Sequence, residues 1–334
     1  MKGRKWLFSL RTRLTLCMSI VVFATVLVLG LQFYSISRDV LSDITAKNVL
    51  HTMINTIEMA DQRYEMIKTA TLELLGNQQL YDMLKDIDAQ GISAYLRHAA
   101  DLRKLLQNTL SEYGNVWAAE ILFGHYRVSY SKTHSLRYGS LEETDVWRHI
   151  QAKCGEAVWL ARGDMPDAII ADESVAVLWH ARALNVIDKT TFRTLFSPKD
   201  EKPVLLVCIR DEYPRDALRK SIAQEHAAYA LLDKHGAFLD GSPSIGHALA
   251  DSDMLLTQPN AGIAHMSVLE SNALVLYARS QVTGWLHVVS LDPDALAARV
   301  LSGMTRSISM AASIMLLAML GMTSVLSHSI ARAA

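Results

Sequence analysis

The chain has 334 residues, of which 50% are hydrophobic and 20% charged, and its 33 basic and 34 acidic residues give a formal net charge of −1. This composition excludes a nucleic-acid-binding tail, a disordered linker, a collagen-like fibre and a small disulfide-stapled protein. The charge is unevenly spread, because no acidic residue precedes Asp39 or follows Asp294. Residues 36–305 hold all 34 acidic residues and 26 basic ones, so they form an acidic segment of net charge −8 between two apolar ends.

Both ends contain an uncharged stretch long enough to cross a membrane. Residues 14–37 and 307–327 carry no Asp, Glu, Lys or Arg, and a helix of about 20 apolar residues spans a hydrocarbon core of about 30 Å. We therefore expect transmembrane helices at 14–35 and 306–327. The alternatives are a cleavable signal peptide for the first stretch and a buried core helix for the second.

The basic residues of the N-terminus predict the orientation of the chain. Five of them precede Leu14, and positive residues favour the cytoplasmic side of a membrane. We expect residues 1–13 to be cytoplasmic, residues 36–305 to be an extracytoplasmic domain, and residues 328–334 to return to the cytoplasm.

A long helix is predicted directly after the first span. Apolar residues recur there in alternating steps of three and four, which is typical of a stalk that pairs with a second copy and equally of a helix that packs on its own domain. Gly76-Asn77 interrupts the helix, and a further amphipathic helix is predicted at 101–113, before Gly114-Asn115. The seam residues are Leu50, Met53, Ile57, Ala60, Tyr64, Ile67, Thr71 and Leu74.

The following segments have the short apolar runs of β-strands, so the predicted fold class is α+β with antiparallel sheets. One sheet module is expected at about 115–212, and a helical connector at 214–226 leads to a smaller one at about 227–292. A helix starting at Asp292 and Pro293 is expected to run into the second span. The predicted strands and hairpin lie at 118–124, 126–130, 157–160, 175–182, 204–209, 228–240, 273–279 and 284–291.

Four groups of residues resemble the double Cache sensor domain of YesM-like sensor histidine kinases. They are Asn77–Tyr81 after the long helix, Trp147 with Gly155–Trp159, Leu232–Gly236, and Thr283–Trp285 running into Leu291–Asp294. The resemblance implies a long helix that carries two PAS-like antiparallel sheets, one far from the membrane and one near it, flanked by two transmembrane helices.

The same resemblance implies an output. Residues 328–334 resemble the start of a HAMP helix, so we expect the sensor portion of a longer receptor, or a shortened gene product, whose parent is a kinase that phosphorylates a response regulator. Related input domains are also found on transcription regulators and chemoreceptors.

Catalytic motifs are absent from the sequence, which has no phosphate-binding loop, no GxGxxG, no HExxH and no GxSxG. We therefore expect no enzyme within these residues, and no cofactor. The 12 histidines lack close spacing with cysteines or carboxylates, so no metal site is expected. Residues 241–246 are predicted to be a surface loop. Cys154 and Cys208 fit either a disulfide or a buried thiol at Cys208.

Aromatic and basic residues of the first module are the candidate ligand-binding residues. A tryptophan face beside a guanidinium suits a sugar or a small anionic solute such as an organic acid, while core packing is the alternative for each tryptophan. In amino-acid-binding double Cache domains an arginine lies two positions before the matching tryptophan, whereas Asp145 holds that place before Trp147 here, followed by Arg148. The candidates are Tyr126, Trp147, Trp159, Arg162, Trp179 and Arg182.

The sequence thus predicts a two-pass, dimeric cell-membrane sensor that contacts membrane lipid, binds a small solute outside the cytoplasm and binds no nucleic acid. Its ligand would favour one of two arrangements of the packed helices. The alternatives are the input domain of a transcription regulator or chemoreceptor, a module that binds a solute-binding protein, and an anchored hydrolase.

Overall fold

The structure is a computed structural model of the chain. It divides into a terminal unit, Met1–Asn48 with Leu291–Ala334, and a central unit, Val49–Ser290. The residues that the structure describes are 10–132, 136–137, 141–142, 144–161, 164–165, 169–170, 177–197, 200–210, 213–222, 227–250, 260–268, 271–292, 309–310, 313–314 and 321.

Helix α1 (Leu10–Glu73) begins in the terminal unit and continues through the central unit. Most of the large apolar side chains described between Ile20 and Ile36 are exposed, for example Val21 at 63% and Leu31 at 62%. Among the helical residues that the structure describes, none form a stretch with both the length and the apolarity that a membrane crossing requires. The second expected span, 306–327, and the helix expected after Asp292 lie almost entirely outside the described residues.

The helices after α1 are short. The Asn77 side chain caps α2, since its oxygen accepts a hydrogen bond from the Leu80 amide at 3.0 Å. Helix α2 was not expected, and α3 begins nine residues before the predicted position 101. The surface loop predicted at 241–246 is wrong from Pro243 on, because α6 starts there and buries Ile245 against a sheet. These elements are η1 (Leu74–Gly76), α2 (Gln78–Gln90), α3 (Ile92–Leu110), α4 (Asp145–Ala152), α5 (Tyr213–Ile222) and α6 (Pro243–Ala250).

The first sheet has the strand order β2-β1-β7-β6-β4, and each of these pairings is antiparallel. All five of its strands were predicted from the sequence and are confirmed. Helix α4 and a separate small pair of strands, β3 with β5, were not expected. The strands are β1 (Val116–Phe123), β2 (Tyr126–Ser131), β3 (Leu136–Arg137), β4 (Val158–Leu160), β5 (Ile169–Ile170), β6 (Val177–Ala183) and β7 (Val204–Arg210).

The second sheet has the order β10-β11-β12-β8-β9. Both sheets have the same topology: a leading hairpin whose first strand pairs with the fifth strand, followed by the fourth and the third. The predicted α+β fold of a long helix with two antiparallel sheets is therefore confirmed, although β10 was not expected. The strands are β8 (Ala227–Leu232), β9 (Phe238–Gly241), β10 (Ala261–Val268), β11 (Ser271–Arg279) and β12 (Leu286–Leu291).

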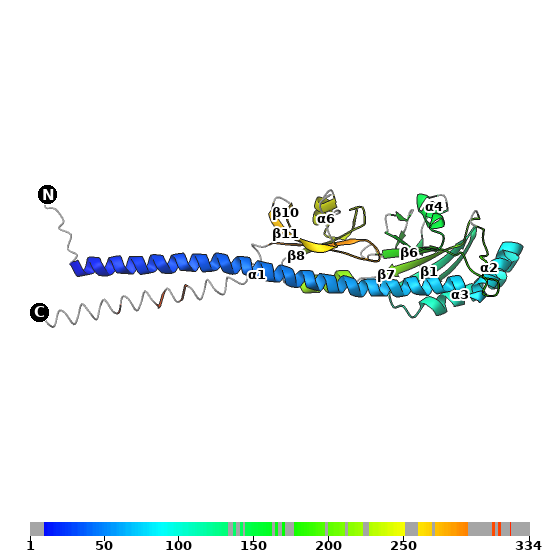
Figure 1. Ribbon diagram of the computed structural model, residues 1–334, viewed down its shortest axis with the longest axis horizontal. Helices are drawn as coiled ribbons and strands as arrows, with labels where there is room; N and C mark the ends of the chain where they lie inside the picture. The colour runs from blue at the N-terminus through cyan, green and yellow to red at the C-terminus, as the bar shows by residue number, and fades with distance from the viewer. Residues whose placement is uncertain are drawn as a thin grey trace. The chain divides into compact units, whose positions relative to one another are not determined.

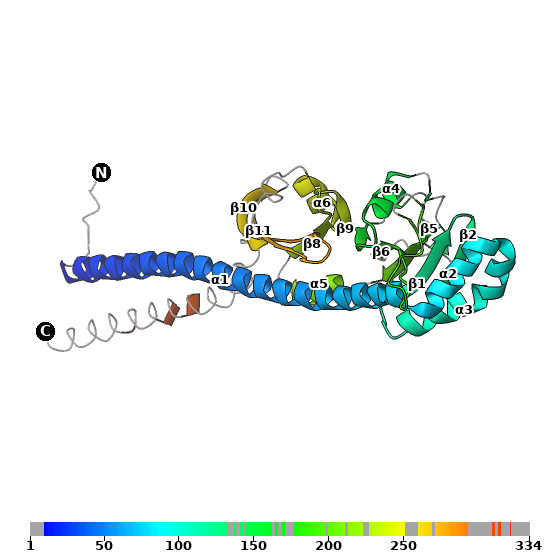
Figure 2. The same cartoon turned by 45° about the vertical axis from the view of Figure 1, so that its right-hand side comes forward.

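Each sheet has a short helix on one face and α1 along the other (Figures 1 and 2). On the outer face of the first sheet, Trp147 and Ile150 of α4 pack in one buried cluster with Trp179. On the outer face of the second sheet, Ile245 and Leu249 of α6 pack in the same way. The opposite faces contact α1, as the residues described below show.

The apolar seam of α1 is buried within this chain, as the interpretation of a helix that packs on its own domain predicts. Leu50 is half-buried, and the rest of the seam is buried within the central unit. A second copy is therefore not needed to cover it. The buried seam residues are Met53, Ile57, Ala60, Tyr64, Ile67, Thr71 and Leu74.

Candidate functional site

Trp147 and Trp179 are the two predicted ligand-binding residues that the structure brings together. Trp147 lies on α4 and Trp179 on β6, and both belong to the buried cluster between α4 and the first sheet. The Trp147 indole Nε1 donates a hydrogen bond to the Glu201 carboxylate at 2.5 Å. We call this side of the first sheet the α4 face.

The loop that carries Glu201 is held by α4. The Gln151 side chain donates to the Lys202 carbonyl at 2.7 Å and accepts from the Lys202 amide at 3.1 Å. The α4 face thus holds two indole rings, Trp147 at 4% and Trp179 at 1% exposure, packed in the core beside one carboxylate. Sequence reasoning missed Glu201 and Gln151, because nothing in their local pattern indicates that they lie beside Trp147.

Trp159 and Arg182 lie on the opposite side, which we call the α1 face. The Trp159 ring centroid is 5.5 Å from that of Tyr64 on α1 and 4.9 Å from that of His180 on β6. Since side chains alternate along a strand, His180 and Arg182 point away from the face of Trp179. The predicted ligand set needs Arg182 on the same side as Trp147 and Trp179. In the structure Arg182 lies on the opposite side.

Tyr126 does not join either group. Tyr126 begins β2, where its ring stacks on that of Tyr95 of α3 with centroids 4.8 Å apart. Arg162 lies outside the described residues. A ligand-binding role for any of the six candidates stays a prediction.

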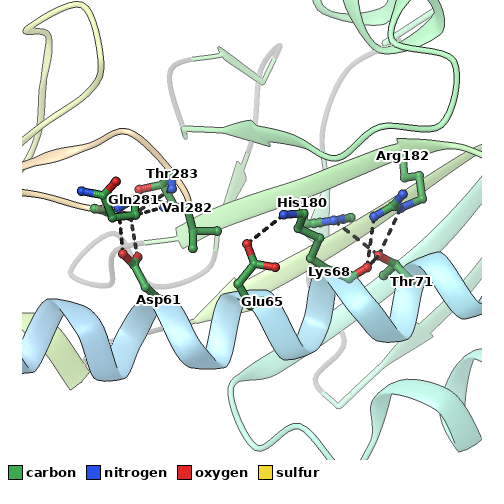
Figure 3. Close-up of polar contacts among 10 residues, drawn as sticks. Asp61, Glu65, Lys68, Thr71, His180, Arg182, Gln281, Val282 and Thr283 are labelled. Atoms are coloured by element: carbon green, nitrogen blue, oxygen red, sulfur yellow. Dashed lines mark hydrogen bonds and ion pairs between the residues drawn. The ribbon is translucent and has the colours of Figure 1, made fainter.

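The Arg182 guanidinium binds α1 directly (Figure 3). Its Nε donates to the Thr71 hydroxyl at 3.2 Å and one Nη donates to the Lys68 carbonyl at 3.0 Å, while the other donates to the Gly155 carbonyl. Arg182 is only 2% exposed, and burial lowers its pKa. We call Lys68, Thr71 and Arg182 the first-sheet anchor.

His180 lies next to this anchor and is fully buried. Its Nε2 is 3.4 Å from the Thr71 hydroxyl oxygen. Burial, and then the positive charge of Arg182, lower the pKa of His180 to about 3, so the ring is neutral at physiological pH. One feature of the sequence could have indicated where His180 lies. It is two residues from Arg182 on one predicted strand, and such side chains share a face of the sheet.

A second polar contact joins α1 to the second sheet. The Asp61 carboxylate, 9% exposed, accepts a hydrogen bond from the Ser280 hydroxyl at 2.5 Å and one from the Gln281 amide at 2.8 Å. Burial raises the pKa of Asp61, although its hydrogen bonds with Ser280, Gln281 and Val282 oppose that change. We call Asp61, Ser280 and Gln281 the second-sheet anchor.

A small cavity of about 30 Å³ lies where α1, α5 and the two sheets meet. It has room for one or two water molecules, which is far less than a sugar or an amino acid needs. On its wall, the Tyr229 hydroxyl is 3.0 Å from the His287 Nδ1. Its lining includes Tyr64, Leu178, Arg215, Tyr229, Thr283 and His287.

Neither a disulfide nor a metal cluster is found in the part of the chain that the structure describes. Cys154 is exposed and Cys208 is buried, and both are free thiols. The disulfide alternative is therefore wrong and the buried thiol is confirmed, with burial raising the pKa of Cys208. No group of three potential ligands gathers among the described histidines, cysteines and carboxylates.

No family model and no curated protein matches the chain. Among solved structures, the ligand-binding domain of Mlp24 with asparagine is similar to it, with 11% identity and a TM-score of 0.50 over 80% of this chain and 98% of that one. At this identity the similarity shows a shared fold.

Two further solved structures are similar at lower scores. The extracellular domain of vpHK1S-Z8, named as a histidine kinase, is 14% identical, with a TM-score of 0.49 over 78% of this chain and 95% of that one. The ligand-binding domain of the Campylobacter jejuni chemoreceptor Tlp3 with 4-methylisoleucine is 12% identical, with a TM-score of 0.46 over 77% and 94%.

Proposed function

We propose that this chain is the sensor input region of a transmembrane receptor and that it binds a small solute at the α4 face of the first sheet. The observation that carries the proposal is the alternation along β6. Trp179 belongs to the α4 face, while His180 and Arg182, on the same strand, contact α1. A solute that shifts β6 therefore acts on α1 through hydrogen bonds that are already formed.

The proposed ligand is a sugar, because the charged group beside the Trp147 indole is the Glu201 carboxylate, whereas Arg182 lies on the α1 face. The Mlp24 domain, which shares the fold, was solved with asparagine, and this supports a small organic solute as the ligand class. Asp145 occupies the place of the arginine that would bind a ligand carboxylate in the amino-acid-binding pattern, and for this reason the proposal favours a sugar. Glu201 beside the Trp147 indole supplies an acceptor for a ligand hydroxyl.

The proposed setting is a cell membrane. Residues 14–35 and 306–327 are the proposed transmembrane helices, with both termini in the cytoplasm and residues 36–305 outside. The uncharged sequence of these stretches supports this, as do the exposed apolar side chains of α1 between Ile20 and Ile36. The proposed parent is a dimeric double Cache sensor histidine kinase of the YesM-like kind, which would act on a response regulator.

The test of the binding site is a ligand screen on the full chain in detergent. Sugars, organic acids and amino acids are screened by thermal shift, and the dissociation constant of each hit is measured by calorimetry. Trp147→Phe and Trp179→Phe should weaken a genuine ligand about tenfold or more, because each removes an indole from the α4 face.

Trp159→Phe is the matched control, since it makes the same substitution on the α1 face of the same sheet. Its affinity for the ligand should stay within about twofold of the wild type. Equal affinity in all three variants would contradict the assigned site, and a screen without any hit would contradict the solute-binding function.

A further inference from the structure

Helix α1 is held to the two sheets at two points ten residues apart, Asp61 and Thr71 (Figure 3). At 1.5 Å per residue the two points are about 15 Å apart along the helix axis. They lie on the same side of α1 as the buried seam, which passes between them at Tyr64 and Ile67. The same short length of helix therefore contacts both sheets.

The second-sheet anchor fixes a whole turn. Ser280, whose hydroxyl donates to Asp61, also accepts hydrogen bonds from the Val282 and Thr283 amides, at 3.3 and 2.9 Å. The Gln281 amide donates to Asp61 directly. The backbone of the β11–β12 connection is therefore bound to the Asp61 carboxylate of α1, partly through the Ser280 hydroxyl. A movement of Asp61 therefore moves the ends of two strands.

A buried carboxylate is a costly way to stabilise a turn. Removing a charge from water is unfavourable, and an apolar pair of the same volume is often at least as stable. What a carboxylate with two directed hydrogen bonds adds is a fixed geometry between helix and turn. The first-sheet anchor has the same character, since Arg182 is also buried and also binds α1 by directed hydrogen bonds.

Residues of α1 and of both sheets also meet between the two anchors. A small cavity there is lined by Tyr64 of α1, Leu178 of β6 and Thr283 of the β11–β12 connection. Because protein interiors are otherwise close-packed and transmit strain, a change at one of these contacts reaches its neighbours.

We propose that the segment Asp61–Thr71 couples the two sheets, with Asp61 as the positioning residue that makes the second sheet follow a change at β6. The inference rests on the proposed function in one respect, since a solute at the α4 face is what would cause the change at β6. The coupling between the sheets should also exist in the ligand-free protein, so it is tested without a ligand.

The test is hydrogen exchange of the full chain in detergent, read at the Gln281–Thr283 amides. Thr71→Val removes the hydroxyl of the first-sheet anchor at nearly constant volume, and it should speed exchange at Gln281–Thr283 about threefold or more, which is the lower range of coupling through packed networks. Thr69→Val is the matched control, because Thr69 lies on the exposed side of α1, and it should leave these amides unchanged.

Coupling is reciprocal, which supplies the second measurement. Asp61→Ala should speed exchange of the Leu178–His180 amides by a similar factor, whereas Glu58→Ala, on the exposed side of α1, should not. The Leu274–Leu276 amides of β11 report global unfolding in every variant. Faster exchange confined to the mutated anchor, or an equal rise at Leu274–Leu276, would overturn the inference while leaving the solute-binding proposal standing. A failed ligand screen would in turn leave the coupling standing.

Discussion

The Arg182 guanidinium makes three hydrogen bonds to two parts of the chain: to the Thr71 side chain and the Lys68 carbonyl of α1, and to the Gly155 carbonyl. A buried guanidinium is tolerated only when its donors are satisfied in this way. Its planar fork matches this set of acceptors, and a lysine ammonium at the end of a flexible stem does not. We therefore expect the residue to be intolerant of its usual replacement.

Arg182→Lys should lower the free energy of unfolding by about 2 kcal/mol or more, because buried acceptors lose their donors. Arg148→Lys is the control, since Arg148 pairs with Asp145 on the surface, where both side chains are mostly exposed, and it should change stability by less than about 0.5 kcal/mol. Urea unfolding of the full chain measures both. Equal stability of the two variants would contradict the structural role of Arg182.

Two histidines that are buried in the described part of the chain, His180 and His287, make stability depend on pH. Burial lowers the pKa of His180 to about 3 and that of His287 to about 4, from the ordinary value of 6.5. Between these values the unfolded chain binds protons that the folded chain does not. Their contribution is therefore complete above pH 6.5 and is lost as the pH falls, by about 1.4 kcal/mol per pH unit for each histidine.

His180→Leu should make this loss smaller, by about 2 kcal/mol between pH 6.5 and pH 5. His149→Leu changes an exposed histidine of α4 and should leave the pH dependence as it is. Urea unfolding at pH 7.5, 6 and 5 measures the effect. Parallel curves for the wild type and His180→Leu would show that His180 titrates alike in the folded and unfolded chains, and would contradict its lowered pKa.

Part of the site could have been read from residue spacing alone. Trp179 and Arg182 are three positions apart on one predicted strand, and an odd separation puts two side chains on opposite faces. The sequence therefore contained the evidence against a joint site for these two residues. The meeting of Trp147 with Trp179, and of Trp147 with Glu201, depends on tertiary packing across more than 30 residues, which no local pattern encodes.

At the scale of elements, the start of α2 is stabilised by a capping residue as well as by the burial of Leu80 and Tyr81. Asn77 follows the turn η1 and its side chain accepts the Leu80 amide. Asn77→Ala should cost about 1 kcal/mol of unfolding free energy, whereas Asn77→Asp, which keeps the acceptor, should cost less than half of that. Thermal unfolding of both variants checks the difference, and equal losses would contradict the cap.

The elements that the sequence predicted share one property, a strong and long enough apolar period. The seam of α1 repeats over three heptads, β7 is apolar from Val204 to Ile209, and β1 and β6 are mostly apolar. Helices α4 and α6 have eight residues each, which is about two turns and too short for a period to stand out. Helix α6 also begins with Pro-Ser-Ile-Gly, a composition typical of loops but compatible with proline at the first helical position.

At the scale of the whole molecule, the proposed topology places the acidic domain outside the cytoplasm. A phosphatase reporter that is active only outside the cytoplasm, fused after the exposed turn at Asp233–Gly236, should therefore be active. The same reporter after Arg13 should be inactive, because the proposal puts that residue in the cytoplasm. Activity after Arg13, or inactivity at the Asp233 turn, would contradict the topology.

The central claim is that a solute at the α4 face acts on α1. Hydrogen exchange of the full chain, with and without the solute found in the screen, tests it most directly. The account predicts slower exchange in α4 and β6 together with a change at Lys68–Thr71 of α1. Slower exchange in α4 and β6 with Lys68–Thr71 unchanged would contradict it.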